Sequence, residues 1–136
     1  MPIAIATTAT HADFDTVAGR TREVLREHGF GVLTEIDVQE TLRQKLGATM
    51  EHYLILGACN PALAHAALGA DKQIGVLLPC NVVVRADPDN PTTIHIEAMN
   101  PQLLTQGADH LALQSVADKA TEQLSTAVAT LAEELA

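Results

Sequence analysis

Apolar residues recur along this chain with two periods, one typical of strands and one typical of helices. Continuous or alternating apolar runs predict strands at residues 3–6, 31–37, 53–56, 74–86 and 93–98. Apolar positions spaced three and four residues apart predict a helix capped by Thr10 and a long helix from Asp109 onward. Shorter helices are expected at 38–46 and 62–68. The predicted order is strand, helix, about four strands with small helical inserts, and a terminal helix.

Capping residues support several of these boundaries. Gly29 and Gly47 stand where helices are expected to end, and Asp37 with Glu40 resembles a capping box. Pro79 lacks an N–H group, so it marks a bulge or strand edge within 74–86. The loop at 87–91 is short enough for a hairpin. We therefore predict an α+β fold, a mostly antiparallel sheet with helices packed on one face.

Composition limits the classes of protein that fit. The 136 residues form one predicted domain (1–136), and 47% of them are hydrophobic. A net charge of −9 and 2% aromatic residues argue against nucleic acid as a partner. The N-terminus lacks the basic leader of a signal peptide, and polar residues interrupt the uncharged stretch 53–70, so no membrane span is expected. We expect a cytoplasmic protein with free thiols.

Candidate chemistry gathers at the two cysteines. Residues 57–61 read Gly-Ala-Cys-Asn-Pro and residues 78–81 read Leu-Pro-Cys-Asn. Asn60 is a good N-cap and Pro61 suits the first helical position, which would place Cys59 beside a helix N-terminus that favours anions or polar ligands. The sequence predicts a binding pocket between the sheet and the long helix, lined by Cys59, Asn60, Cys80 and Asn81.

Other interpretations of these residues remain open. Both cysteines can be buried packing residues, and both asparagines can serve the backbone alone. No metal site is expected, because the six histidines are scattered and no CxxC pair occurs. Hydrolase and phosphate-binding motifs are also missing from the sequence, so whether the protein is an enzyme stays open and no cofactor is named. A strand face with Thr93, His95 and Glu97 would suit an interaction module.

Four ordered segments carry a family likeness. Residues 29–38, 45–47, 53–61 and 77–82 resemble the domain of unknown function family 302, over a stretch from about His11 to Pro101. The resemblance implies a strand, helix, four-strand, helix order similar to TATA-binding-protein-like domains, often in homodimers, and no known activity. The predicted function is thus a cytosolic homodimer that binds a small molecule. The alternative is a thiol-based redox or sulfur-relay protein that uses Cys59 and Cys80.

Overall fold

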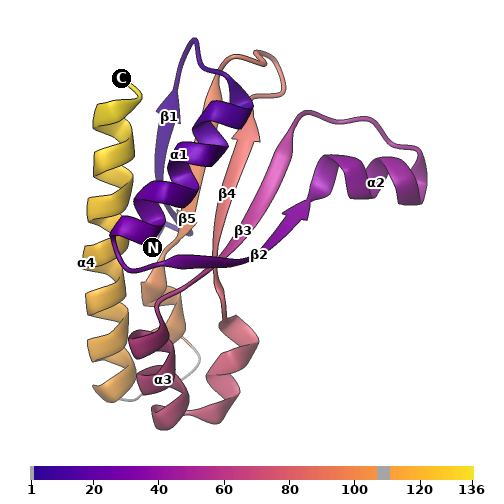
Figure 1. Ribbon diagram of the computed structural model, residues 1–136. Coiled ribbons are helices and arrows are strands. Elements are labelled where there is room, and N and C mark those ends of the chain that lie inside the picture. Colours follow the sequence, from indigo (N-terminus) through magenta and orange to yellow (C-terminus); the bar gives the residue numbers. More distant parts are fainter. Residues whose placement is uncertain (1, 107–110) are drawn as a thin grey trace.

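A five-stranded sheet is the centre of the molecule, in a computed structural model that describes residues 2–106 and 111–136. The strand order is β1-β5-β4-β3-β2, and every neighbouring pair is antiparallel. The strands are β1 (Ala4–Ala9), β2 (Gly31–Asp37), β3 (Tyr53–Cys59), β4 (Cys80–Ala86) and β5 (Ile94–Met99). The helices are α1 (Phe14–Glu27), α2 (Val38–Leu46), α3 (Pro61–Ala70) and α4 (Leu111–Glu134), with 3-10 turns η1 (Lys72–Leu77) and η2 (Pro101–Thr105). The predicted α+β class is confirmed (Figure 1).

The two faces of the sheet differ because side chains alternate along each strand. On one face Leu56, Val82 and Ile96 are at most 1% exposed, and they join residues of α1 and α4 in the main hydrophobic cluster. The long helix contributes the expected apolar stripe, including buried Leu113 and Leu124. Helices therefore cover one face, as predicted. The described helices include none long and apolar enough to cross a membrane.

Helix caps form mostly where the sequence placed them. Asp37 accepts a hydrogen bond from the Glu40 amide at 3.0 Å, and Gly47 ends α2 in the left-handed conformation. The predicted cap at Thr10 is wrong, because Asp13 caps α1 by accepting from the Thr16 amide at 3.0 Å. A carboxylate three residues before the bonded amide has the reach that this cap needs.

The segment preceding β4 corrects the sequence prediction. Residues 74–86 were expected to be one interrupted strand, but Lys72–Leu77 form a 3-10 helix and β4 begins only at Cys80. Asp71 caps that turn by accepting from the Gln73 amide at 2.9 Å. Pro79, which cannot donate to a sheet ladder, separates the two elements. The sequence also predicts a short turn that starts at Asn100 and closes at Gly107, and a long helix from Asp109. Gly107 and Asp109 lie outside the described residues.

Helix α2 stands apart from the other helices beside the β2–β3 end of the sheet (Figure 1). It has no buried residue, and Leu46 at its end is 75% exposed. Leu33 and Ile36 of the adjoining edge strand β2 are 69% and 49% exposed. This corner of the molecule, made by β2 and α2, thus presents largely exposed apolar side chains.

Candidate functional site

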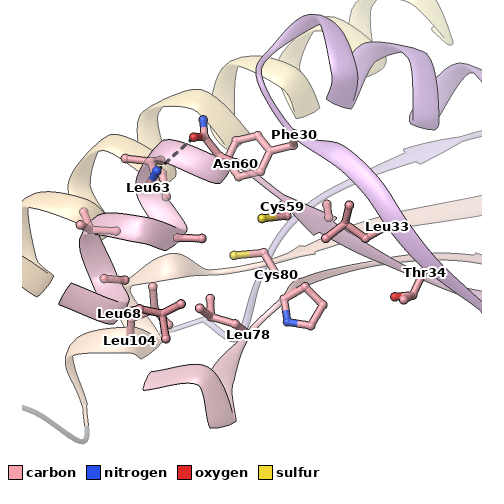
Figure 2. A pocket seen from close by; sticks show the side chains of 16 residues that line it. Phe30, Leu33, Thr34, Cys59, Asn60, Leu63, Leu68, Leu78, Cys80 and Leu104 are labelled. Carbon is pink, nitrogen blue, oxygen red and sulfur yellow. Dashed lines mark hydrogen bonds between the residues drawn. The ribbon is translucent and has the colours of Figure 1, made fainter. Parts of the chain in front are cut away.

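A cavity of about 330 Å³ lies where β3 ends and β4 begins, between the sheet, α3 and α4. Figure 2 shows its wall from close by. The lining residues are Phe30, Leu33, Thr34, Ala58, Cys59, Asn60, Leu63, Ala64, Ala67, Leu68, Leu78, Pro79, Cys80, Leu104, Val116 and Ala120. None of them carries a charge, so the wall is almost wholly apolar. Leu33 and Pro79 are exposed, which places them at the rim.

The cavity exists because small side chains separate two hydrophobic clusters. Phe30, Ala58 and Ala120 belong to the main cluster beneath the sheet, whereas Ala67 and others belong to a second cluster around α3. Alanines from β3, α3 and α4 face the same volume, and none of them reaches far enough to fill it. Protein interiors are normally close-packed, so a void of this size between two clusters is a built feature of the fold.

The two cysteines meet in this wall. Cys80 pairs across the sheet with Ala58, the neighbour of Cys59, and paired Cα atoms lie about 4.5–5.5 Å apart. Strict alternation would send Cys59 to the opposite face, but the chain leaves β3 at this residue to enter α3. Figure 2 accordingly shows both thiol groups directed into the same space.

The thiols differ in environment. Cys59 is half-buried and Cys80 is buried. Burial raises the pKa of the Cys80 thiol from an ordinary value near 9.0 to about 11, and the neighbouring Cys59 adds to the rise. Cys80 is therefore a protonated thiol at neutral pH. Its sulfur is a poor nucleophile unless a ligand or metal displaces the proton.

Asn60 lines the cavity, but its amide serves the fold. Its Oδ1 accepts from the Leu63 amide at 3.2 Å and so caps α3, as the sequence predicted. Its Nδ2 donates to Gln123 Oε1 at 2.9 Å, which ties the start of α3 to α4. Gly29 approaches this pair closely, since a Cβ at Gly29 would lie 3.1 Å from Asn60 Nδ2. Asn60 therefore shapes the cavity by holding α3 in place.

Asn81 lies outside the cavity wall. It is exposed, pairs with Gly57, and follows inward-facing Cys80 by one position in β4. Alternation along the strand therefore directs its side chain to the open face of the sheet. Three of the four residues predicted for the pocket are brought together, and Asn81 is not.

The open face carries a separate polar cluster. Arg85 pairs with Glu97 at 2.6 Å, and His95 contacts Asp87 at 2.9 Å and Thr8 at 3.1 Å. His95 and Glu97 belong to the strand face that the sequence suggested as a contact surface, and both side chains already have partners here. The residues within 2–106 and 111–136 form no group of three or more histidine, cysteine or carboxylate side chains suited to a metal.

The sequence did not predict the lining residues that lie far from the cysteines along the chain. Leu104, Val116 and Ala120 belong to no motif, and the fold alone brings them to the cysteines. One feature of the sequence does point to the cavity. Alanines repeat along residues 62–70, and their short side chains leave space beside that helix unfilled.

Comparison with known proteins places this arrangement in a family. A crystal structure described as an uncharacterized conserved protein DUF302 from Bacillus stearothermophilus superposes with a TM-score of 0.84 at 26% identity, covering 95% of this chain and 98% of that one. No curated protein matches the sequence. The family profile described as Domain of unknown function DUF302 matches residues 5–131. The chain therefore belongs to the DUF302 family, as its four sequence segments predicted.

Proposed function

We propose that this protein binds a small, uncharged and largely apolar molecule in the cavity between the sheet, α3 and α4. The observation that carries the proposal is a cavity of about 330 Å³ whose wall has no charged side chain. Ligand pockets typically occupy about 300–1,000 Å³ and are lined mostly by apolar groups. The volume equals that of roughly eleven liquid water molecules, at about 30 Å³ each. A compact ligand such as a small ring or a short branched chain matches this size.

The polar groups of the wall restrict the ligand further. The amide of Asn60 is used by Leu63 and Gln123, which leaves the thiols and Thr34 as the side-chain polar groups facing the space. Thiols are weak hydrogen-bond donors. A charged organic molecule would lose its hydration without gaining a strong hydrogen-bond partner, so among organic ligands the site favours neutral ones.

A pair of alanines on α3 gives a matched test. Ala64 lines the cavity, whereas Ala66 is exposed on the other side of the same helix. Binding of the uncharged fluorophore 1-aminoanthracene is titrated against wild type, Ala64→Leu and Ala66→Leu. Filling the space should weaken binding at least about tenfold, or about 1.4 kcal/mol, in the first variant only. Equal affinity in both variants would contradict the proposal.

The thiol-based alternative is supported by the presence of both cysteines in one wall. The raised pKa of Cys80, about 11, opposes a role for that sulfur as the attacking nucleophile. Redox or sulfur-relay chemistry would therefore depend on Cys59. Alkylation of folded protein followed by mass spectrometry tests it, and a Cys59 that reacts only after unfolding would exclude this function.

We also propose that two copies associate in the cytosol, where the free thiols would remain reduced. Support comes from exposed apolar side chains on the elements of the corner made by β2 and α2, Leu33 and Ile36 on β2 and Leu46 at the end of α2, together with the unpaired edge of β2. Light scattering should report a dimer for wild type and a monomer for Leu46→Glu. Leu111→Glu is the control, because Leu111 is 91% exposed on α4 and away from that corner. A monomeric wild type would contradict the dimer.

A further inference from the structure

The two cysteines occupy one cavity although 20 residues separate them along the chain, from Cys59 to Cys80. They come from neighbouring strands, β3 and β4, and the register places Cys80 opposite the residue before Cys59. Both thiol groups point into the cavity rather than into the packed core (Figure 2). The same wall therefore holds two soft sulfur ligands side by side.

The surroundings decide which ions such a pair can hold. Among the lining residues there is no imidazole and no carboxylate, so no third strong ligand is at hand. Zinc sites normally use four ligands, and iron–sulfur clusters use four cysteines. A soft monovalent ion that is satisfied by two thiolates requires neither. Thiolate ligands suit Cu(I), zinc and iron–sulfur clusters, and of these only Cu(I) is satisfied by two sulfurs. An apolar wall also keeps away water and hard oxygen ligands.

The charge of the complex also suits this end of the sheet. Two thiolates and one Cu(I) carry a net charge of −1. Helix α3 begins at Pro61, two residues after Cys59, and its ten residues direct the positive end of the helix dipole toward this site. The dipole partly offsets the cost of placing an anion against an apolar wall.

We propose that Cys59 and Cys80 form a two-coordinate site for Cu(I). Each thiol releases its proton to solvent as one Cu–S bond forms, and the carrier that delivers the ion leaves with its own ligands. Copper stays in the monovalent state throughout, so no oxidant or reductant takes part. The site does not require the apolar ligand, although both would use the same cavity.

An anaerobic competition experiment tests the site. Full-length protein is titrated with Cu(I) in the presence of the chromophoric chelator bicinchoninate, using wild type, Cys59→Ala and Cys80→Ala, with Cys59→Ser and Cys80→Ser as second variants. Wild type should withdraw one Cu(I) per chain from the chelator and gain near-ultraviolet sulfur-to-copper absorption. Every single variant that keeps the native circular dichroism spectrum should lose both properties.

Two outcomes would overturn the proposal. One is a wild type that leaves all copper with the chelator. The other is a folded single variant that retains copper as wild type does. Binding of 1-aminoanthracene to wild type is measured in a separate titration without copper, so failure of the copper site and failure of the apolar pocket give different results.

Discussion

Gly57 offers the sharpest test of how closely β2 and the segment before β4 pack against β3. It is a buried residue of β3, two positions before Cys59, and its missing side chain faces Thr34 and Pro79. A Cβ at Gly57 would overlap the Thr34 hydroxyl and lie 2.9 Å from Pro79 Cγ. Ordinary carbon contacts are about 3.5–4.0 Å. Gly57→Ala therefore forces one strand or both neighbours to move.

The expected cost follows from these contacts. Overpacking a core costs about 1–3 kcal/mol, and two simultaneous overlaps favour the upper end. Alanine regains about 0.5–1 kcal/mol because it loses less backbone entropy than glycine. The net loss in unfolding free energy is thus about 2 kcal/mol. With an unfolding entropy of ~2.1 cal/mol/K per residue over 136 residues, Tm should fall by ~7 °C.

Thermal unfolding followed by circular dichroism measures this loss, with Gly31→Ala as the control. Gly31 lies on the neighbouring strand β2, and a Cβ there would meet no atom within 4 Å. Adding Thr34→Ala to Gly57→Ala removes the overlapping hydroxyl and should restore part of the stability. Should Gly57→Ala match Gly31→Ala, or the double variant recover nothing, the close-approach argument is refuted.

Two further changes probe the site itself. The pKa of the Cys80 thiol is about 11 in the folded protein and about 9.0 when the thiol is exposed. The protonated thiol therefore contributes about 3 kcal/mol to the free energy of unfolding below pH 9, and this contribution is lost as the pH rises toward 11. The free energy of unfolding measured in urea should fall over that pH range for wild type and should not fall for Cys80→Ala. At pH 8 the same difference slows alkylation of folded Cys80 by ~100-fold relative to unfolded protein, and equal rates would refute its burial. Asn60→Ala should cost about 1–2 kcal/mol in urea unfolding, because α3 loses its cap and Gln123 its partner. Asn60→Asp, which keeps an acceptor for the Leu63 amide, should lose less, and equal losses would contradict the capping role.

The sequence predicted helix ends correctly where a single capping side chain determines them. Asp37 and Asn60 cap the helices that follow them, because a short polar side chain before a helix satisfies its free amides wherever the chain lies. Ile94 and Ile96 face the core as their alternation indicated. The prediction failed at residues 74–77, where apolar residues typical of a strand belong to a 3-10 helix. There Ile74 packs into the cluster around α3, and tertiary contacts outweigh the propensity of a short run.

The cavity was the harder feature to predict, since its volume comes from side chains that are too short. The cysteine segments indicated that both thiols line one wall, whereas Val116 and Ala120 join that wall only through the packing of α4.

The place of Asn81 outside the cavity wall has a more instructive cause. Cys59-Asn60 and Cys80-Asn81 are alike as pairs of residues but differ in their place on the strand. β3 ends at Cys59, so the following asparagine turns inward as a helix cap. β4 begins at Cys80, so strict alternation governs Asn81 and sends it to the open face. The same two residue types thus take opposite positions because one pair closes a strand and the other opens one.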